Sequence, residues 1–336
     1  MTFDLRNPRL RRRLIIPAVG VILATVLYFL PTGYFVVSPG ITRDVSGMIS
    51  VGQGRGPGPG RFLMTTVATR EANAWYFLYG ALDPSSELRP ESDFVPQGKS
   101  LEEYIKETEK MMRQSQDYAR AAALRALGYP VEVKGDGVRV VEVVPDSPAQ
   151  DNLQPGDVIV AIDAQKVERV DDLMKAMSEI PIGASVDVRF LRSGQEQRLS
   201  LKTVENKTRP GKAMIGVRTE TLNEGFVFPK EIKIDADHIT GPSAGLMFAL
   251  EIVRQLRKDV DITGGRVIAG TGTIDPTGKV GAIGGIAQKV ITAERDGAVL
   301  FFAPRENFPQ AARAAKRIQV VPVASLQEAL DFLTRK

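Results

Sequence analysis

The hydrophobic pattern of the chain begins with one long apolar stretch. No charged side chain occurs from Leu14 to Thr42, and residues 14–30 are its densest part. Crossing the hydrocarbon core of a membrane takes about 20 helical residues, which this stretch provides if the helix continues past Pro31. Five arginines precede it, so the pattern predicts a cytoplasmic basic tail at 1–13 and a transmembrane anchor at 14–37.

A cleaved signal peptide is the alternative interpretation of this stretch. No Ala-x-Ala pattern follows the apolar residues, and this favours an uncleaved anchor. We therefore expect a single-pass protein of the cell membrane, with the remainder of the chain translocated and the folded part extracytoplasmic.

Residues 38–125 alternate between strand-like and helix-like patterns, which predicts a mixed α/β segment. Residues 72–82 indicate a short apolar helix. The longest element should be an amphipathic helix that begins after Ser100, because Glu103 stands at capping-box spacing. Gly128 is placed to end this helix.

From about residue 137 the pattern becomes that of several short strands. The segments that carry it are PDSPA (145–149), LQPGD (153–157), VIVAID (158–163), DDLMKAM (171–177) and VDVRFLRSGQ (186–195). As a set they resemble a PDZ domain of the bacterial protease-associated kind, which we place at 126–206. The resemblance implies a small β-sandwich with helices, whose exposed sheet edge takes an extended peptide as an added strand.

The strand that receives the peptide in such a domain follows a Leu-Gly-aromatic loop. Leu127, Gly128 and Tyr129 are the candidate for this loop. Gly128 is equally well explained as the C-cap of the preceding helix, and both interpretations stay open.

Composition restricts the chemistry that the chain can perform. The 336 residues include no Cys and a single His, His238, which excludes thiol nucleophiles, disulfides and any metal site with two His ligands from one chain. We expect no metal and no cofactor. A net charge of +4 is too small to indicate a nucleic-acid partner. Hydrolytic chemistry would have to use Ser, Thr, Asp, Glu or Lys.

Ser243 is the first candidate catalytic residue. It lies between Gly241 and Gly245, directly before a nearly wholly apolar helix. Free backbone amides and the positive end of a helix dipole beside a hydroxyl are the parts of an oxyanion hole. A serine that only caps the helix is the alternative.

Lys289 is the second candidate. If a helix starts near Gly285, Lys289 shares its apolar face with Ile286, Val290 and Ala293. Burial would then lower the pKa of the amine and allow it to act as a general base near neutral pH. The alternative is a lysine whose amine extends to the surface.

The C-terminal region, from Met214 to about Leu333, carries three motifs together: GPSAG (241–245), TGT (271–273) and IGGIAQK (283–289). In combination they resemble the α/β proteolytic domain of the Lon family of serine–lysine endopeptidases, which we place at 210–336. The resemblance implies that Ser243 is the nucleophile, Lys289 the base and Thr271 the residue that orients the lysine amine. Gly241 and Ala244 would support the site, and His238 has no place in it.

The chain departs from the usual Lon proteases because it shows no ATPase module. Lys279 follows a Thr-Gly pair, but its spacing and the valine after it do not fit a phosphate loop. With the predicted anchor and PDZ domain, the chain resembles the membrane-bound Lon-like proteases of bacteria, the YlbL/SepM type. That resemblance implies an ATP-independent serine endopeptidase acting on exported peptides or unfolded protein segments, with the PDZ domain binding the substrate.

Two alternatives belong to other classes of protein. One is a membrane-tethered PDZ adaptor with an inactive Lon-like domain, against which the presence of both Ser243 and Lys289 argues. The other is a phosphate- or nucleotide-binding protein, but the Gly-rich motifs of the sequence do not match a phosphate loop. The sequence decides neither the substrate nor the number of subunits, so a homo-oligomer stays open.

Overall fold

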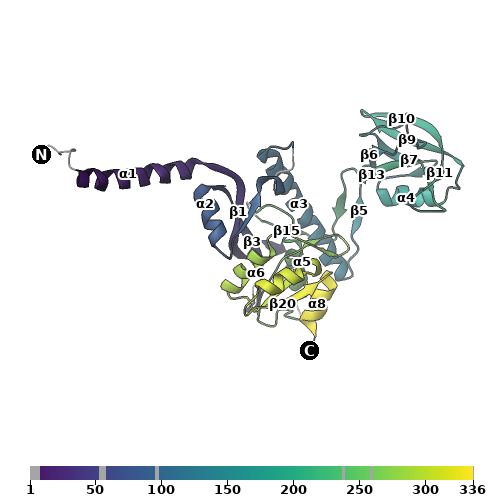
Figure 1. Ribbon diagram of the computed structural model, residues 1–336. Helices are drawn as coiled ribbons and strands as arrows, with labels where there is room; N and C mark the ends of the chain where they lie inside the picture. Colours follow the sequence, from purple (N-terminus) through teal and green to yellow (C-terminus); the bar gives the residue numbers. More distant parts are fainter. Residues whose placement is uncertain (1–7, 53–57, 95–97, 237–238, 258–259, 336) are drawn as a thin grey trace. The chain divides into compact units, whose positions relative to one another are not determined.

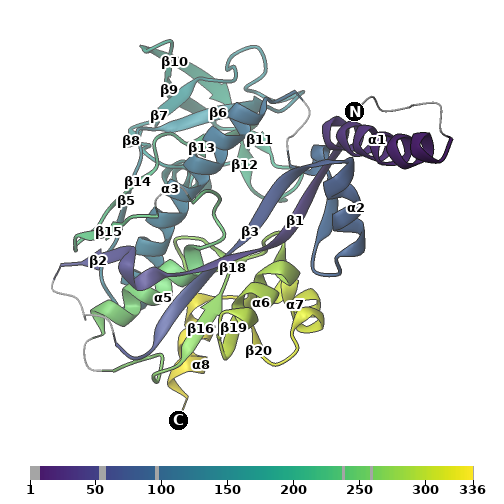
Figure 2. The ribbon, with the colours of Figure 1, turned by 90° about the vertical axis from the view of Figure 1, so that its left-hand side faces the viewer.

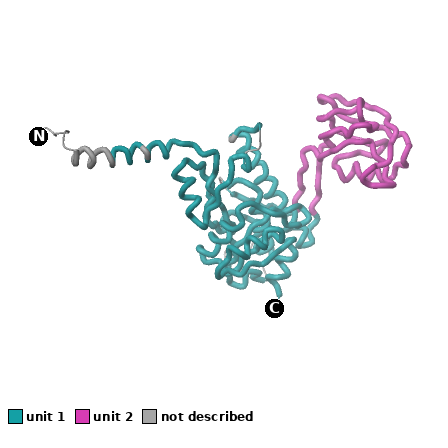
Figure 3. Tube along the Cα trace, viewed as in Figure 1, with its two compact units in different colours: residues 1–130, 230–336 teal, residues 131–229 magenta. Residues whose placement is uncertain are grey.

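The structure is a computed structural model that describes residues 8–52, 58–94, 98–236, 239–257 and 260–335. The chain forms two compact units (Figure 3). The first combines residues 1–130 with residues 230–336, and the second contains residues 131–229.

The N-terminal helix α1 (Pro8–Phe29) is followed almost at once by strand β1 (Pro31–Asp44). Proline has no N–H to donate and disfavours the helical conformation in the residue before it, so the helix ends there. The prediction that the anchor extends to residue 37 is therefore wrong, because Val36 and Val37 are buried core residues of β1. Within the described residues, no helix is both long enough and apolar enough to cross a membrane.

A six-stranded sheet forms the centre of the first unit, in the order β20-β19-β16-β3-β1-β4 (Figures 1 and 2). Strands β3, β16, β19 and β20 are parallel to one another, and β1 is antiparallel to both β3 and β4. Besides β1, the bounds are β3 (Arg61–Asn73), β4 (Glu87–Pro90), β16 (Val267–Gly270), β19 (Leu300–Pro304) and β20 (Gln319–Val323).

Strand β3 joins the N-terminal and C-terminal parts of the chain in this sheet. Its residues Phe62 to Met64 pair with β16 on one side, while its longer C-terminal part pairs with β1. Residues 38–125, which the sequence places outside the domain at 210–336, thus contribute an inner strand to the same sheet. The pairing joins positions about 200 residues apart, which a local pattern does not report.

Helices cover both faces of the sheet. Leu63, Ala269 and Phe301 share one core cluster with α6 (Ile286–Arg295) and α7 (Phe308–Ala314). Because strand side chains alternate between faces, Gly270 points the opposite way, and a Cβ there would lie 2.7 Å from the sulfur of Met247 on α5. That opposite face carries α5 (Gly245–Leu256), which also packs against α3 (Leu101–Ala126) and α8 (Leu326–Thr334).

Helix α3 is built as its sequence predicts. Ser100 is the N-cap, with its hydroxyl and the Glu103 carboxylate forming the capping box. Gly128, with φ of +78°, follows the helix in the left-handed conformation that glycine allows. The other elements of the first unit are η1 (Val45–Gly47), β2 (Ile49–Val51), α2 (Ala74–Leu82), η2 (Glu91–Asp93), β15 (Ile232–Ile234), β17 (Thr273–Ile274), β18 (Val280–Gly281) and η3 (Arg305–Asn307).

The second unit is an antiparallel sheet in the order β10-β9-β7-β6-β13, with one helix, α4. Its core includes Val138, Ile159 and Phe190, all essentially fully buried. Strand β13 lies at the edge of the sheet. The bounds are β5 (Glu132–Lys134), β6 (Val138–Val143), β7 (Val158–Ile162), β8 (Gln165–Lys166), α4 (Val170–Ser178), β9 (Ser185–Arg192), β10 (Gln195–Lys202), β11 (Val204–Glu205), β12 (Ala213–Met214), β13 (Val217–Thr221) and β14 (Gly225–Val227).

The chain enters and leaves the second unit along one short ladder, because β5 and β14 pair antiparallel. We therefore expect a chain in which a short Gly/Ser linker replaces residues 131–229 to keep the first unit folded. Labelling of Ser243 by a serine-directed phosphonate measures this outcome. A fragment of residues 210–336 lacks β3 and α3 and should neither give a cooperative unfolding transition nor be labelled, and efficient labelling of that fragment would contradict the assignment of β3.

Candidate active site

Ser243 lies in a loop that α3 holds in place just before α5. The Gly241 N–H donates to the Thr108 carbonyl over 3.1 Å, and the Ser115 hydroxyl donates to the Pro242 carbonyl over 3.0 Å. Helix α5 begins at Gly245 with Ala244 as its N-cap, and no side chain caps it. The Ser243 hydroxyl is therefore not the helix cap that the sequence left as an alternative.

Lys289 points into the interior from the first turn of α6. Gly285 is the N-cap of that helix in the left-handed conformation, with φ of +67°. Ile286, Val290 and Ala293 are fully buried on the same face, and the lysine itself is only 3% exposed. The alternative of an amine that extends to the surface is excluded by this burial.

The Lys289 amine connects two hydroxyls. Its Nζ lies 2.7 Å from Ser243 Oγ and 3.1 Å from Thr271 Oγ1. The Thr271 hydroxyl in turn donates to the Ser243 carbonyl over 2.9 Å, and the same carbonyl accepts the Gly272 N–H. The end of β16, the loop before α5 and the start of α6 thus meet at one amine.

Burial lowers the pKa of Lys289 from its ordinary value of 10.5 to about 8, and desolvation is the cause. Within the described part of the chain, no carboxylate forms an ion pair with this amine. At pH 7 the neutral fraction rises from roughly one molecule in 3,000 to roughly one in ten. The amine can therefore accept a proton from a hydroxyl 2.7 Å away near neutral pH.

A cavity of about 340 Å³ opens over Ser243 and Lys289. One wall is the part of β3 from Met64 to Thr69, and the other is the loop from Ile239 to Ala244. The N–H groups of Ser243 and Ala244 make no hydrogen bond to described residues, whereas that of Gly241 is bound to Thr108. Both predicted supporting residues, Gly241 and Ala244, thus line the cavity, and the Gly241 N–H ties the loop to α3.

Sequence reasoning missed the contributions of β3 and α3 to this site. Thr65 lies at the cavity wall, and its hydroxyl is 3.4 Å from the carbonyl of Gly270, the residue before Thr271. The carboxyl ends of neighbouring parallel strands meet at one edge of a sheet, where ligands of α/β proteins commonly bind. Recognising β3 as a neighbour of β16 would have identified this wall. His238, which has no place in the predicted dyad, lies outside the described residues.

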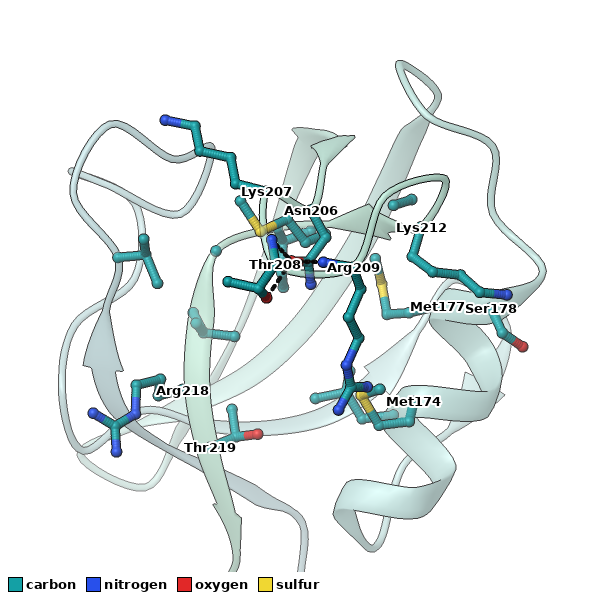
Figure 4. Close-up of a pocket in the computed structure, with 17 residues that line it drawn as sticks. Met174, Met177, Ser178, Asn206, Lys207, Thr208, Arg209, Lys212, Arg218 and Thr219 are labelled. Atoms are coloured by element: carbon teal, nitrogen blue, oxygen red, sulfur yellow. Dashed lines mark hydrogen bonds between the residues drawn. The ribbon is translucent and has the colours of Figure 1, made fainter.

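A second cavity, of about 620 Å³, lies within the second unit (Figure 4). Leu173, Met174 and Met177 of α4 form one side, and β13 with the residues before it forms the other. Ile215, Gly216 and Val217 line the end of the cavity where β13 begins. Gly216 has φ of +88°, and a Cβ there would collide with Ser147, so only glycine fits.

Charge on the lining of this cavity is of one sign. Lys207, Arg209, Lys212 and Arg218 contribute cationic side chains, and none of its lining residues is acidic. Arg218 is paired with Glu142 at 2.8 Å. Figure 4 shows Arg209 extending from the segment between β11 and β12 across the cavity toward α4. An apolar groove with a cationic rim suits an extended ligand that carries negative charge.

The predicted peptide-binding residues Leu127, Gly128 and Tyr129 do not line this cavity. They lie at the C-terminus of α3 in the first unit, where the Gly128 and Tyr129 N–H groups donate to the carbonyls of Arg125 and Leu124. The structure therefore places them in a helix cap, which is the second of the two interpretations that the sequence allowed.

Comparison with known proteins gives two family matches. Residues 125–203 match the PDZ domain, and residues 232–334 match the Lon protease (S16) C-terminal proteolytic domain. The chain carries a Lon-type proteolytic domain and a PDZ domain. The proteolytic match holds Ser243, Thr271 and Lys289, and the other match holds α4 and most of the sheet of the second unit.

Individual relatives are similar over parts of the chain. Lon protease 2 of Bacillus subtilis is 30% identical over 141 residues, which are 42% of this chain and 24% of that protein. Lon protease of Mesomycoplasma hyopneumoniae is 38% identical over 100 residues, or 28% of this chain and 11% of that protein. The magnetosome formation protease MamE of Magnetospirillum gryphiswaldense is 40% identical over 70 residues, 20% of this chain and 9% of that protein.

Among solved structures, the PDZ domain of the SdrC-like protein of Listeria monocytogenes is similar, with 26% identity and a TM-score of 0.24. The match covers 26% of this chain and 92% of that one. The chain thus spans less than a quarter of the length of the curated relatives named above.

Replacing the buried amine by an apolar side chain should stabilise the proteolytic domain. A fall in pKa from 10.5 to about 8 corresponds to about 3 kcal/mol, so we expect Lys289→Met to raise the free energy of unfolding at pH 7 by about 2–3 kcal/mol. The unfolded state binds more protons than the folded state between pH 8 and 10.5, so the wild type gains stability there and the advantage of the variant disappears.

Denaturant unfolding followed by the fluorescence of Trp75, which lies in the first unit, measures this difference. Lys279→Met is the control, because Lys279 is exposed and its loss should change stability by less than about 0.5 kcal/mol. A Lys289→Met variant that is less stable than the wild type at pH 7 would contradict the assigned cost of burial.

Proposed function

We propose that the chain is a serine endopeptidase that uses Ser243 as nucleophile and Lys289 as general base. The observation that carries the proposal is the contact of a buried amine, with its pKa lowered to about 8, with the hydroxyl of a serine that opens onto a cavity. Serine is a poor nucleophile unless a base accepts its proton, and this amine is the group within reach.

The reaction follows from this geometry. Neutral Lys289 accepts the Ser243 proton as Oγ attacks the peptide carbonyl carbon. The N–H groups of Ser243 and Ala244, which make no hydrogen bond to described residues, stabilise the oxyanion. Lys289 then passes the proton to the leaving amine, which separates and leaves an ester on Ser243. A water molecule then attacks the ester carbonyl carbon while Lys289 accepts one of its protons. As the ester bond breaks, Lys289 returns this proton to Ser243 Oγ, and the product leaves as a carboxylic acid that loses its proton to solvent. Thr271 holds the amine in position through its hydroxyl.

The alternative of an inactive adaptor fits these observations less well. Burying an amine without a carboxylate partner destabilises the fold by about 3 kcal/mol, and a purely structural role would be served better by methionine or leucine. The contact between the Lys289 amine and the Ser243 hydroxyl would let the buried amine act as a general base. We also propose that cleavage proceeds without ATP, because proton transfer from Ser243 to Lys289 uses no phosphate group.

We further propose that the groove between α4 and β13 holds the substrate. Strand β13 is an edge strand, which can pair with an extended peptide, and the apolar side chains of α4 face the same cavity. Its cationic rim favours peptides with a free carboxylate or acidic side chains. The groove would select exported peptides or unfolded segments, and Ser243 would cut them.

We also propose that α1 anchors the chain in the cell membrane with the folded part extracytoplasmic. Arginines precede an uncharged stretch, and Val21, Ile22 and Phe29 of α1 expose most of their apolar surface. Such surface is unfavourable in water and favourable in lipid.

Substitutions at the proposed dyad test the chemistry. Ser243→Ala should abolish cleavage of an unstructured fluorogenic peptide, and Lys289→Arg should lower it at least 1,000-fold, because a guanidinium stays protonated. The rate for the wild type should rise with pH along a limb whose midpoint is near 8, since only the neutral amine acts as base. Near wild-type cleavage by Lys289→Arg would remove lysine from its role and make His238 the next residue to test.

A matched pair of substitutions tests the groove. Met174 and Ile182 are 49% and 47% exposed, but only Met174 lines the cavity. Met174→Glu should reduce the affinity of the chain for a substrate peptide at least tenfold, because it places a negative charge in the groove, whereas Ile182→Glu should leave it unchanged. Fluorescence anisotropy of a labelled peptide gives the affinity, and equal affinities of the two variants would count against the groove.

A further inference from the structure

Helix α2 exposes an apolar stripe that the proposed catalytic and peptide-binding sites do not use. Its sequence, AWYFLYGAL, contains no charge. Trp75, Leu78, Tyr79 and Leu82 recur at the spacing of one helix face and are 44%, 52%, 57% and 74% exposed. The opposite side packs closely, because a Cβ on Gly80 would lie 3.0–3.3 Å from Leu88 and Val36. The stripe therefore faces away from the sheet.

Helix α2 lies beside the C-terminal end of α1 (Figure 2). The Ala74 N–H donates to the Leu30 carbonyl over 3.1 Å, and the Trp75 indole N–H donates to the Ala24 carbonyl over 3.0 Å. Ala24 comes five residues before the last residue of α1, which at 1.5 Å per residue is about 8 Å along the helix. Amphipathic helices at membrane surfaces bury their apolar side about 5–10 Å deep.

The length of α1 leaves room for such a contact. Between the last arginine and Phe29 the helix has sixteen residues, from 14 to 29, which span about 24 Å. The hydrocarbon core is about 30 Å thick. If the arginines remain on the cytoplasmic side, residues 14–29 end a few ångströms short of the outer edge of the hydrocarbon core. Only the segment at the end of α1 reaches this remaining depth, and α2 is attached there.

We propose that α2 is an interfacial helix whose stripe of Trp75, Leu78, Tyr79 and Leu82 lies in the outer surface of the lipid bilayer. This inference rests on the membrane anchor proposed above. Tryptophan and tyrosine favour this depth because their rings are apolar and their polar groups reach water. The proteolytic domain is then held against the membrane at two points, α1 and α2, rather than by a single anchor.

This contact sets the height of the active-site cavity. Strand β3 runs directly into α2, and Val67 at the cavity wall precedes Asn73, the N-cap of α2, by six residues. At about 3.3 Å per residue, the cavity wall lies no more than about 20 Å from the start of the interfacial helix. Substrates would be cut close to the membrane surface, as suits polypeptides that emerge from it.

Trp75 is the single tryptophan of the chain and reports directly on this contact. The full chain is reconstituted into phosphatidylcholine vesicles, recovered by flotation, and examined with lipids brominated at shallow or deep acyl positions. We expect shallow bromines to quench Trp75 at least twice as strongly as deep ones, and aqueous acrylamide to quench it weakly. A chain that does not float refutes the anchor itself; a chain that floats with Trp75 open to acrylamide and untouched by bromine refutes only the role of α2.

Substitution of the stripe provides the matched comparison. Leu78→Ser with Leu82→Ser should at least double acrylamide quenching of Trp75 in vesicles, while Val299→Ser, at a position 55% exposed elsewhere, should leave it unchanged. These are surface changes and should leave cleavage of a soluble peptide unaltered. Unchanged quenching in the double variant would overturn the proposal. Protection of Trp75 from acrylamide that depends on the protein-to-lipid ratio, with no quenching by bromine, would also overturn the proposal. That result would indicate that a second copy of the chain covers the stripe.

Discussion

The constraint on which the proteolytic domain depends is the exclusion of water from the Lys289 amine. Lys289 is held between Ser243 and Thr271, no carboxylate among the described residues compensates its charge, and desolvation lowers its pKa. Any change that admits water would raise the pKa of Lys289 toward its ordinary value and reduce the neutral fraction of the amine near pH 7. The packing of α6 on the sheet is therefore part of the chemistry, because it excludes the water.

The residues of this domain come from two parts of the sequence, before and after the second unit, and the surroundings of Lys289 need both parts. The loop that carries Ser243 is held by carbonyl and hydroxyl groups of α3, and the cavity wall is β3, both of which precede the PDZ domain in sequence. Thr271 and Lys289 follow it. The insertion leaves the sheet intact because β5 and β14 run side by side, so its two connections occupy little more space than one loop.

Patterns of neighbouring residues predicted much of this structure, but they did not predict which strands far apart in the sequence pair with each other. The capping box at Ser100 and the buried face of α6 each depend on residues close in sequence. The place of β3 beside β16 depends on residues about 200 positions apart. The loop at Leu127–Tyr129 shows a different limit, because a helix cap and a peptide-binding loop both need glycine with positive φ.

The cavity at Ser243 and the cavity between α4 and β13 each retain a feature that a purely structural role would eliminate. An edge strand such as β13 leaves unpaired backbone groups beside an apolar groove, and folds usually cover or blunt such edges. A buried amine without a counter-ion lowers stability, and an apolar residue would repair it. In the proposed function both features become favourable when a polypeptide is bound, one through added strand pairing and the other through proton transfer. The proposed binding and cleavage of a peptide would thus account together for two costs that the free protein carries.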